Sequence, residues 1–215
     1  MNNYSKVVAG LVFGWFVFAL SAAALHLFDN ALNRIGVSVA LAAGLPLIVF
    51  FLWLAASTRF REFARSLNPR VLTWWQTARI LGVVFVILEA QQLLPARFAL
   101  SAGYGDIFIG ATAWFAATKL ANPRTRALFI LWQTLGIADL VSAVALGVTA
   151  GLFQSAGPSM HLVTVLPLSL IPTFLVPLFL MFHLISIAQV SKWRETSSGL
   201  QRSGRSGKVA GSLAA

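Results

Sequence analysis

The sequence has no cysteine and few acidic residues. Without cysteine among its 215 residues, the chain can form neither a disulfide bond nor a thiolate metal site. Only six residues are Asp or Glu, and charged residues make up 10% of the chain, whereas about 25% is usual for a soluble domain. Nucleophile elbows, H-E-x-x-H, phosphate loops and Rossmann fingerprints are also missing from the sequence, so no soluble type of catalysis is favoured.

Long apolar runs take up most of the chain. Hydrophobic residues make up 58% of it, and the mean hydropathy is +0.81. A bilayer span needs about 20 apolar residues, and this length is met or approached by 7–28, 36–57, 75–95, 105–121, 127–153 and 160–188. We therefore predict an all-α, polytopic membrane protein. Residues 1–194 are expected to form a bundle of six transmembrane helices. Residues 195–215, rich in Ser, Gly and basic residues, are expected to form a disordered cytoplasmic tail.

The basic residues indicate how the spans are oriented. The chain carries 16 Lys and Arg and a formal net charge of +10. All of them except Arg34 and Arg97 fall on one side of the predicted spans, in short loops instead of on one compact surface. The positive-inside rule makes that side cytoplasmic. We therefore predict a protein of the cell inner membrane with both termini in the cytoplasm and no nucleic-acid partner. Arg79, close behind Trp74 and Trp75, is counted here as cytoplasmic.

One short stretch, residues 101–106, reads SAGYGD. It resembles the selectivity filter of potassium channels, which reads T-V-G-Y-G and is usually followed by Asp. Such a filter implies four copies of the loop whose carbonyl groups replace the ion's hydration shell, and in that family a short pore helix precedes it. Only ARFALSA lies between Pro95 and Gly103, which is too short for a pore helix. We therefore predict a tight turn at Gly103 and Gly105, with Asp106 as the N-cap of the next helix.

A carboxylate lies well inside the fifth predicted span, at Asp139. Helical spacing puts Gly136, Asp139, Ala143 and Gly147 on one face, and small residues let helices approach closely in lipid. An ionisable residue within a span is a functional candidate. The alternative is a structural hydrogen bond that holds two helices together.

Four more polar residues lie near the predicted outer surface. We predict a polar vestibule built from Glu89, Gln92, Arg97 and Asp106 that leads inward to Asp139. The structural alternative is an ion pair of Arg97 with Glu89 or Asp106, because Arg bonds a carboxylate in a bidentate manner.

The histidines permit a different class of function. His26 ends the first predicted span and His161 begins the sixth, so two imidazoles at similar depth could ligate one haem b iron. His183 follows His161 by 22 residues, or about 33 Å along a helix, so these two cannot share an iron. Interfacial or hydrogen-bonded histidines are the alternative.

Together these features predict that the chain moves an ion, a proton or a small polar solute through the bundle. One alternative is a haem- or quinone-binding subunit of a membrane redox complex. Another is an accessory helix bundle that packs against partner proteins. The expected partners are the lipid bilayer and the transported species. A homo-oligomer or other membrane subunits stay open, and no metal site is predicted.

Overall fold

The computed structural model describes residues 3–28, 37–153, 157–190 and 193, and within these residues it is all-helical, with no strand. The tail predicted for 195–215 lies outside the described residues. Among the described residues, five helical segments are long and apolar enough to cross a membrane: Tyr4–Ala24, Ser38–Ala56, Pro69–Ala90, Pro123–Gly151 and Ile171–Val190. The predicted class of helical membrane protein is therefore confirmed.

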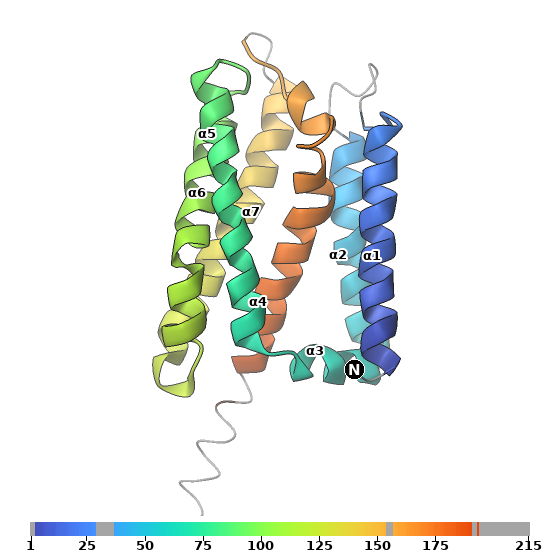
Figure 1. Cartoon of the computed structure of the whole chain (residues 1–215), viewed down its shortest axis with the longest axis vertical. Helices are drawn as coiled ribbons and strands as arrows, with labels where there is room; N and C mark the ends of the chain where they lie inside the picture. Colours follow the sequence, from blue (N-terminus) through green and yellow to red (C-terminus); the bar gives the residue numbers. More distant parts are fainter. Residues whose placement is uncertain (1–2, 29–36, 154–156, 191–192, 194–215) are drawn as a thin grey trace, which may run out of the picture.

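Three of the helices form the N-terminal part of the chain (Figure 1): α1 (Asn3–Ala24), α2 (Val37–Ala56) and α3 (Thr58–Ser66). Helix α3 is short and lies across one end of the bundle. It is tied to α2 because Nη1 of Arg61 donates to the carbonyl oxygens of Leu54 and Ala55, at 2.7 and 2.9 Å. These carbonyl groups end α2 and have no partner within their own helix.

The next span is one continuous rod with a tighter middle. It consists of α4 (Pro69–Trp75), a 3₁₀ segment η1 (Gln76–Gly82) and α5 (Val83–Ala90). A 3₁₀ helix has 3.0 residues per turn, so side chains three apart point the same way. The buried residues of η1 are Gln76, Arg79 and Gly82, which fits this period.

The remaining elements complete the bundle: α6 (Ala96–Phe115), a π-helical segment η2 (Ala116–Leu120), a 3₁₀ turn η3 (Pro123–Thr125), α7 (Arg126–Phe153), a 3₁₀ turn η4 (His161–Thr164) and the final helix (Ile171–Val190), which begins with a π-helical segment η5 (Ile171–Leu175).

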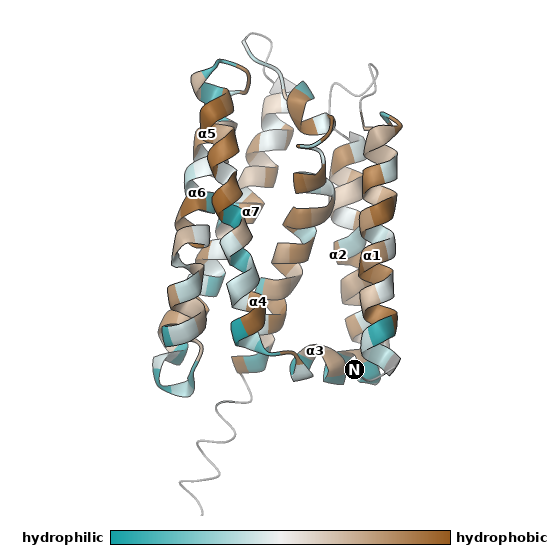
Figure 2. Cartoon of the chain, in the orientation of Figure 1, coloured by the Kyte–Doolittle hydropathy of each residue, from teal (hydrophilic) through white to brown (hydrophobic). Residues whose placement is uncertain are grey.

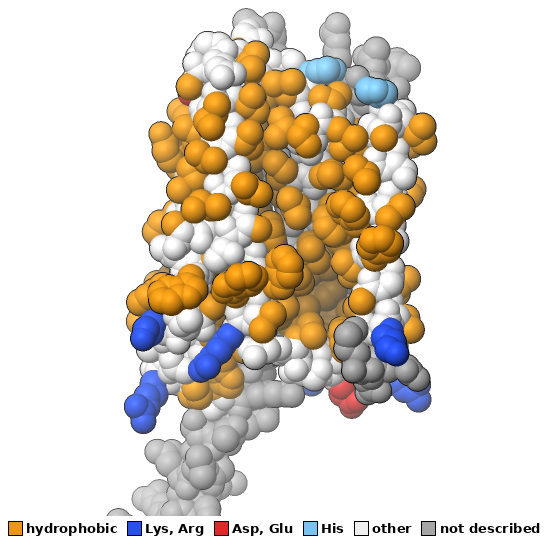
Figure 3. Space-filling view, viewed as in Figure 1, with side chains coloured by type: hydrophobic (Ala, Val, Ile, Leu, Met, Phe, Trp, Pro, Cys, Tyr) orange, Lys and Arg blue, Asp and Glu red, His pale blue; other side chains and the backbone are white. Residues whose placement is uncertain are grey.

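The helices form two groups with the final helix between them (Figure 1). On one side, α6 packs against η1, α5 and α7. On the other side, α1 and α2 contact the final helix through η5. Hydrophobic residues line the long helices, and hydrophilic residues lie at the end that carries α3 and where α5 connects to α6 (Figure 2). The Lys and Arg side chains visible in Figure 3 lie at the end that carries α3, which we call the basic end.

The turn predicted at Gly103 and Gly105 is wrong, and so is the N-cap predicted at Asp106. All three residues lie inside α6. The chain reverses earlier, where Gln92 adopts a positive φ of 58° and Pro95 is the N-cap of α6. A proline disfavours helix at the residue before it, so Pro95 separates α5 from α6. Gly103 and Gly105 therefore serve a purpose other than a turn.

That purpose is close contact between helices. A Cβ atom on Gly103 would lie 2.6 Å from Cγ2 of Val86 in α5. A Cβ atom on Gly110, another glycine of α6, would overlap the backbone nitrogen of Ile80 in η1. Small residues in lipid let two backbones meet in this way, so α6 can lie directly on the span that carries η1. The glycines Gly10 and Gly14 of α1 have open space at the same position.

We expect Gly110→Ala to lower the midpoint of thermal unfolding in detergent. The new methyl group meets the Ile80 backbone, which cannot rotate away, and such overpacking costs roughly 1–3 kcal/mol. The matched control is Gly44→Ala in α2, where nothing lies within 4 Å of the added atom. That substitution should be neutral or stabilising by up to about 1 kcal/mol. Equal midpoints for the two variants would contradict the close contact of α6 with η1.

Candidate functional site

The interior of the bundle holds a buried arginine, Arg79 of η1. Its side chain is 1% exposed, so the assignment of Arg79 to a cytoplasmic loop is wrong. It lies within the membrane-span candidate Pro69–Ala90. A charged group removed from water is costly unless it is paired and hydrogen-bonded, and the contacts of Arg79 meet this condition.

All three guanidinium nitrogens of Arg79 are bonded, and the partners come from three other helices. Nε donates to Oδ1 of Asp106 in α6 at 2.7 Å. Nη2 donates to Oδ2 of Asp139 in α7. Nη1 donates to the Gly136 carbonyl oxygen and to Nε2 of His183 in the final helix, both at 3.3 Å. We call Arg79, Asp106, Asp139 and His183 the charge cluster.

The hydrogen bonds define the tautomer of His183, which is fully buried. A guanidinium has only donors, so Nε2 of His183 must accept from Arg79. Nδ1 then carries the ring proton and donates to Oε1 of Gln133. The amide of Gln133 in turn donates to Oγ1 of Thr73 at 2.9 Å. In this arrangement His183 is neutral, and both of its nitrogens are occupied.

The charges of the cluster do not balance when both carboxylates are ionised. One guanidinium faces two carboxylates and a neutral imidazole, which leaves a formal charge of −1. A net charge within a membrane span is unfavourable, and one added proton would make the cluster neutral. The side chains of Asp106 and Asp139 are each 14% exposed, whereas that of Arg79 is 1% exposed. The carboxylates therefore form the more accessible edge of the cluster.

Two glycines make room for the ionisable groups. The position of a Cβ atom on Gly105 of α6 is taken by the Asp139 carboxylate, and that on Gly136 of α7 by the ring of His183. A larger residue at either position would force the neighbouring side chain out of its hydrogen bonds. Gly105, the second glycine of SAGYGD, is therefore part of the site, because it leaves space for the Asp139 carboxylate.

The predicted face of α7 is confirmed. Asp139 bonds Arg79, Gly136 contacts His183, and Gly147 would place a Cβ atom 3.5 Å from Met160 and Phe98. These residues face the neighbouring helices, as their helical spacing predicts. Of the five residues predicted for the polar pathway, the structure brings Asp106 and Asp139 together, and Arg79 joins them.

The other three predicted residues, Glu89, Gln92 and Arg97, do not join the cluster. Glu89 follows Arg79 by ten residues, which is about 15 Å along a helix. Gln92 donates to the Glu89 carbonyl oxygen at 3.3 Å. Arg97 is exposed, and among the described ion pairs it bonds neither Glu89 nor Asp106.

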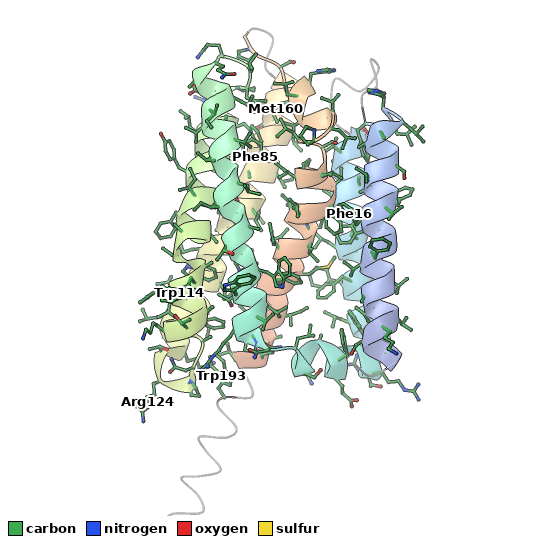
Figure 4. The ribbon with its side chains drawn as sticks, viewed as in Figure 1. Phe16, Phe85, Trp114, Arg124, Met160 and Trp193 are labelled. Carbon is green, nitrogen blue, oxygen red and sulfur yellow. The ribbon has the colours of Figure 1, made fainter. Side chains whose placement is uncertain are left out.

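Apolar residues occupy the space between this group and the cluster. The buried core there consists of Phe85, Leu94, Phe98, Ala99, Ala102 and Val163. Met160 packs against it, and Figure 4 shows Phe85 and Met160 toward the end of the bundle opposite α3. The predicted vestibule is therefore not one continuous polar group in this structure.

The residues proposed for haem, His26 and His161, are both exposed. His26 follows α1 and His161 begins η4. Haem ligation by these two stays a prediction. Among the described residues, no group of three or more His, Asp or Glu is arranged to hold a metal ion.

Sequence reasoning missed Arg79, His183, Gln133 and Thr73 as site residues. A signal was present, because polar or small residues recur every three positions on three of the four helices that carry the cluster. They are Thr73, Gln76 and Arg79, then Gln133, Gly136 and Asp139, then His183, Ser186 and Gln189. The triplet Trp-Gln-Thr also occurs at 75–77 and at 132–134, and each of its glutamines is 1% exposed.

These features define a helical protein with several candidate membrane spans and an Arg–Asp–Asp–His cluster between them. The chain belongs to a family described as a domain of unknown function, DUF8737, whose model matches residues 36–191. No curated protein and no solved structure matches the chain. The matched residues contain the whole charge cluster, and α1 lies outside them.

We expect Arg79→Leu to destabilise the fold strongly. It leaves the carboxylates of Asp106 and Asp139 without their cation, and breaking a buried ion pair costs about 3–5 kcal/mol. The control is Arg97→Leu, an exposed arginine whose loss should change stability by no more than about 0.5 kcal/mol. Thermal unfolding in detergent compares the two. If Arg79→Leu unfolds at the same temperature as Arg97→Leu, the cluster does not support the bundle.

Proposed function

We propose that this protein moves protons across a membrane through the charge cluster. The observation that carries the proposal is the pairing of one guanidinium with two carboxylates and a neutral histidine between helices long enough to cross a bilayer. Ionisable residues inside membrane helices commonly form proton relays and ion pathways. The proposal narrows the sequence prediction of an ion, a proton or a small polar solute to the proton.

The packing of the cluster favours a proton over a larger species. The guanidinium of Arg79 is bonded at every nitrogen, and His183 is bonded at both of its nitrogens. A solute would have to displace several of these bonds. A proton needs only to bind a carboxylate of Asp106 or Asp139 and leave it again, and the formal charge of −1 favours its binding.

The proposal includes a topology with six spans. Helix α6 has 20 residues, which is about 30 Å long and matches a bilayer core, and it runs beside the other long helices (Figure 1). The Lys and Arg side chains visible in Figure 3 lie at the basic end. The positive-inside rule supports placing this end, and both termini, on the cytoplasmic side of the inner membrane.

We expect Asp139→Asn to abolish most proton movement. The amide keeps the shape of the side chain but cannot take up a proton, and Arg79 then faces a single carboxylate, so the cluster is already neutral. Proton flux into proteoliposomes, followed with an entrapped pH-sensitive dye under an imposed potential, should fall on the order of a hundredfold, the low end of what positioned proton-transfer groups contribute. The control is Glu62→Gln, which removes an exposed carboxylate on α3.

The outcome is decisive in either direction. Flux in Asp139→Asn equal to that of Glu62→Gln, with normal elution from a sizing column, would show that the cluster does not carry protons. The same assay on Glu89→Gln tests the vestibule predicted from the sequence. A large loss there would bring Glu89 back into the pathway.

A further inference from the structure

Beyond the charge cluster, buried polar side chains continue toward one end of the bundle. Gln76 precedes Arg79 by one 3₁₀ turn and is 1% exposed. Ser186 and Gln189 follow His183 at successive three-residue steps in the final helix and are 0% and 4% exposed. A step of three residues rises about 4.5 Å in the α-helical part of the final helix and about 6 Å in the 3₁₀ segment η1. These residues therefore extend from the cluster toward the basic end.

Within the described part of the chain, the side-chain oxygens of these three residues have no hydrogen-bond partner. They are Oε1 of Gln76, Oγ of Ser186 and Oε1 of Gln189, and all are buried. An unsatisfied buried polar group costs about 1–3 kcal/mol. Buried water is the usual partner of such groups, and each water typically makes about three hydrogen bonds.

The amide nitrogens fix which way the two glutamines point. Nε2 of Gln76 donates to the Phe179 carbonyl oxygen at 3.2 Å. Nε2 of Gln189 donates to the carbonyl oxygens of Ala64 and Leu67, at 3.0 and 2.7 Å. Turning either amide round would place its oxygen against a carbonyl oxygen. The unpartnered oxygens are therefore the ends left to accept from water.

The far end of this polar series lies at α3. Ala64 belongs to α3 and Leu67 is its C-cap, so Gln189 links the final helix to the helix that lies across the basic end (Figure 1). From His183 to Gln189 the distance along the helix is about 9 Å. A few buried waters would span it.

In the other direction the buried residues next to the cluster are apolar. Val176, Phe179 and Leu180 of the final helix pack against Leu140 of α7 in a hydrophobic core. Thr173, ten residues before His183, is buried, but its hydroxyl donates to the Ser169 carbonyl oxygen at 2.7 Å. Ser169 also has an unpartnered hydroxyl, but it precedes His183 by 14 residues, or about 21 Å along a helix. The polar interior next to the cluster thus opens toward one end only.

We propose that buried waters join Gln76, Ser186 and Gln189 into a hydrated path that connects the charge cluster to the basic end. The path would let protons reach His183 and the carboxylates of Asp106 and Asp139 from the α3 side alone. Its role in proton entry rests on the proposed function, whereas its hydration does not.

The test uses the absence of native cysteine. In Ser186→Cys the new thiol is the only one in the chain, and sulfur replaces oxygen with little change of shape. Ag⁺ in chloride-free buffer is small enough to follow a single file of water and reacts with thiols. Ag⁺ is added to one side of reconstituted vesicles. The remaining free thiol is then counted with a maleimide after denaturation.

Two reference variants make the result interpretable. Glu62→Cys, on the exposed surface of α3, shows which vesicle side is the α3 side. Ser169→Cys is matched to Ser186→Cys, because both serines are 0% exposed with unpartnered hydroxyls and both lie on the C-terminal stretch of the chain. We expect Ag⁺ added on the α3 side to consume the thiol of Ser186→Cys at least roughly tenfold faster than that of Ser169→Cys, a difference of about 1.4 kcal/mol in barrier.

A second variant tests the route itself. Gln189→Leu in the Ser186→Cys background replaces the polar group nearest α3 with an apolar one and should slow the reaction of Ag⁺. Equal reaction rates at positions 186 and 169, or reaction of position 186 only from the side opposite α3, would overturn the hydrated path.

Proton flux of the unsubstituted protein, measured in vesicles prepared in the same way, separates the two proposals. Reaction of Ser186→Cys with Ag⁺, together with no flux in the unsubstituted protein, leaves the path in place and rejects proton movement. Flux sensitive to Asp139→Asn in a protein whose Ser186→Cys thiol does not react rejects the path and leaves proton movement in place.

Discussion

A guanidinium that cannot reach water must have its N–H groups bonded within the protein, and at Arg79 this requirement organises the bundle. Arginine stays protonated in proteins, so the Arg79 side chain cannot lower the cost of its burial by becoming neutral. Its partners have to come from several directions at once: α6 and the final helix each supply one, and α7 supplies two. The glycines of these helices follow from the same need, because Gly105 and Gly136 leave the space that Asp139 and His183 occupy.

The local form of the helix that carries Arg79 serves the same interaction. In an α-helix, residues three apart diverge by about 60° around the axis, whereas in a 3₁₀ helix they lie in line. Within η1 this brings Gln76, Arg79 and Gly82 to one buried face. Gln76 reaches the final helix, Arg79 reaches three helices, and Gly82 leaves the space taken by Asp106. The tighter segment therefore concentrates three interior contacts within two turns.

How much of this was predictable from the sequence depended on the kind of signal. Composition and span length predicted the helical membrane class, and helical spacing predicted that Asp139 faces other helices. Arg79 was missed because an arginine just behind two tryptophans is expected to reach the surface with its long side chain. Gly103 and Gly105 were misread because glycine serves both tight turns and close packing. Pro95 was the better indicator of where the chain reverses.

The residue range of the family match agrees with the extent of the charge cluster and its supporting contacts. The matched residues 36–191 contain the whole cluster and the polar side chains that lead from it toward α3. Helices α1 and α2 contribute no side chain to the cluster's hydrogen bonds, and they meet the final helix at η5. Helix α1 lies outside the match, and only 17% of its most apolar window is buried within the chain. The interactions that hold Arg79 are thus complete without α1, whose apolar surface is free to face lipid.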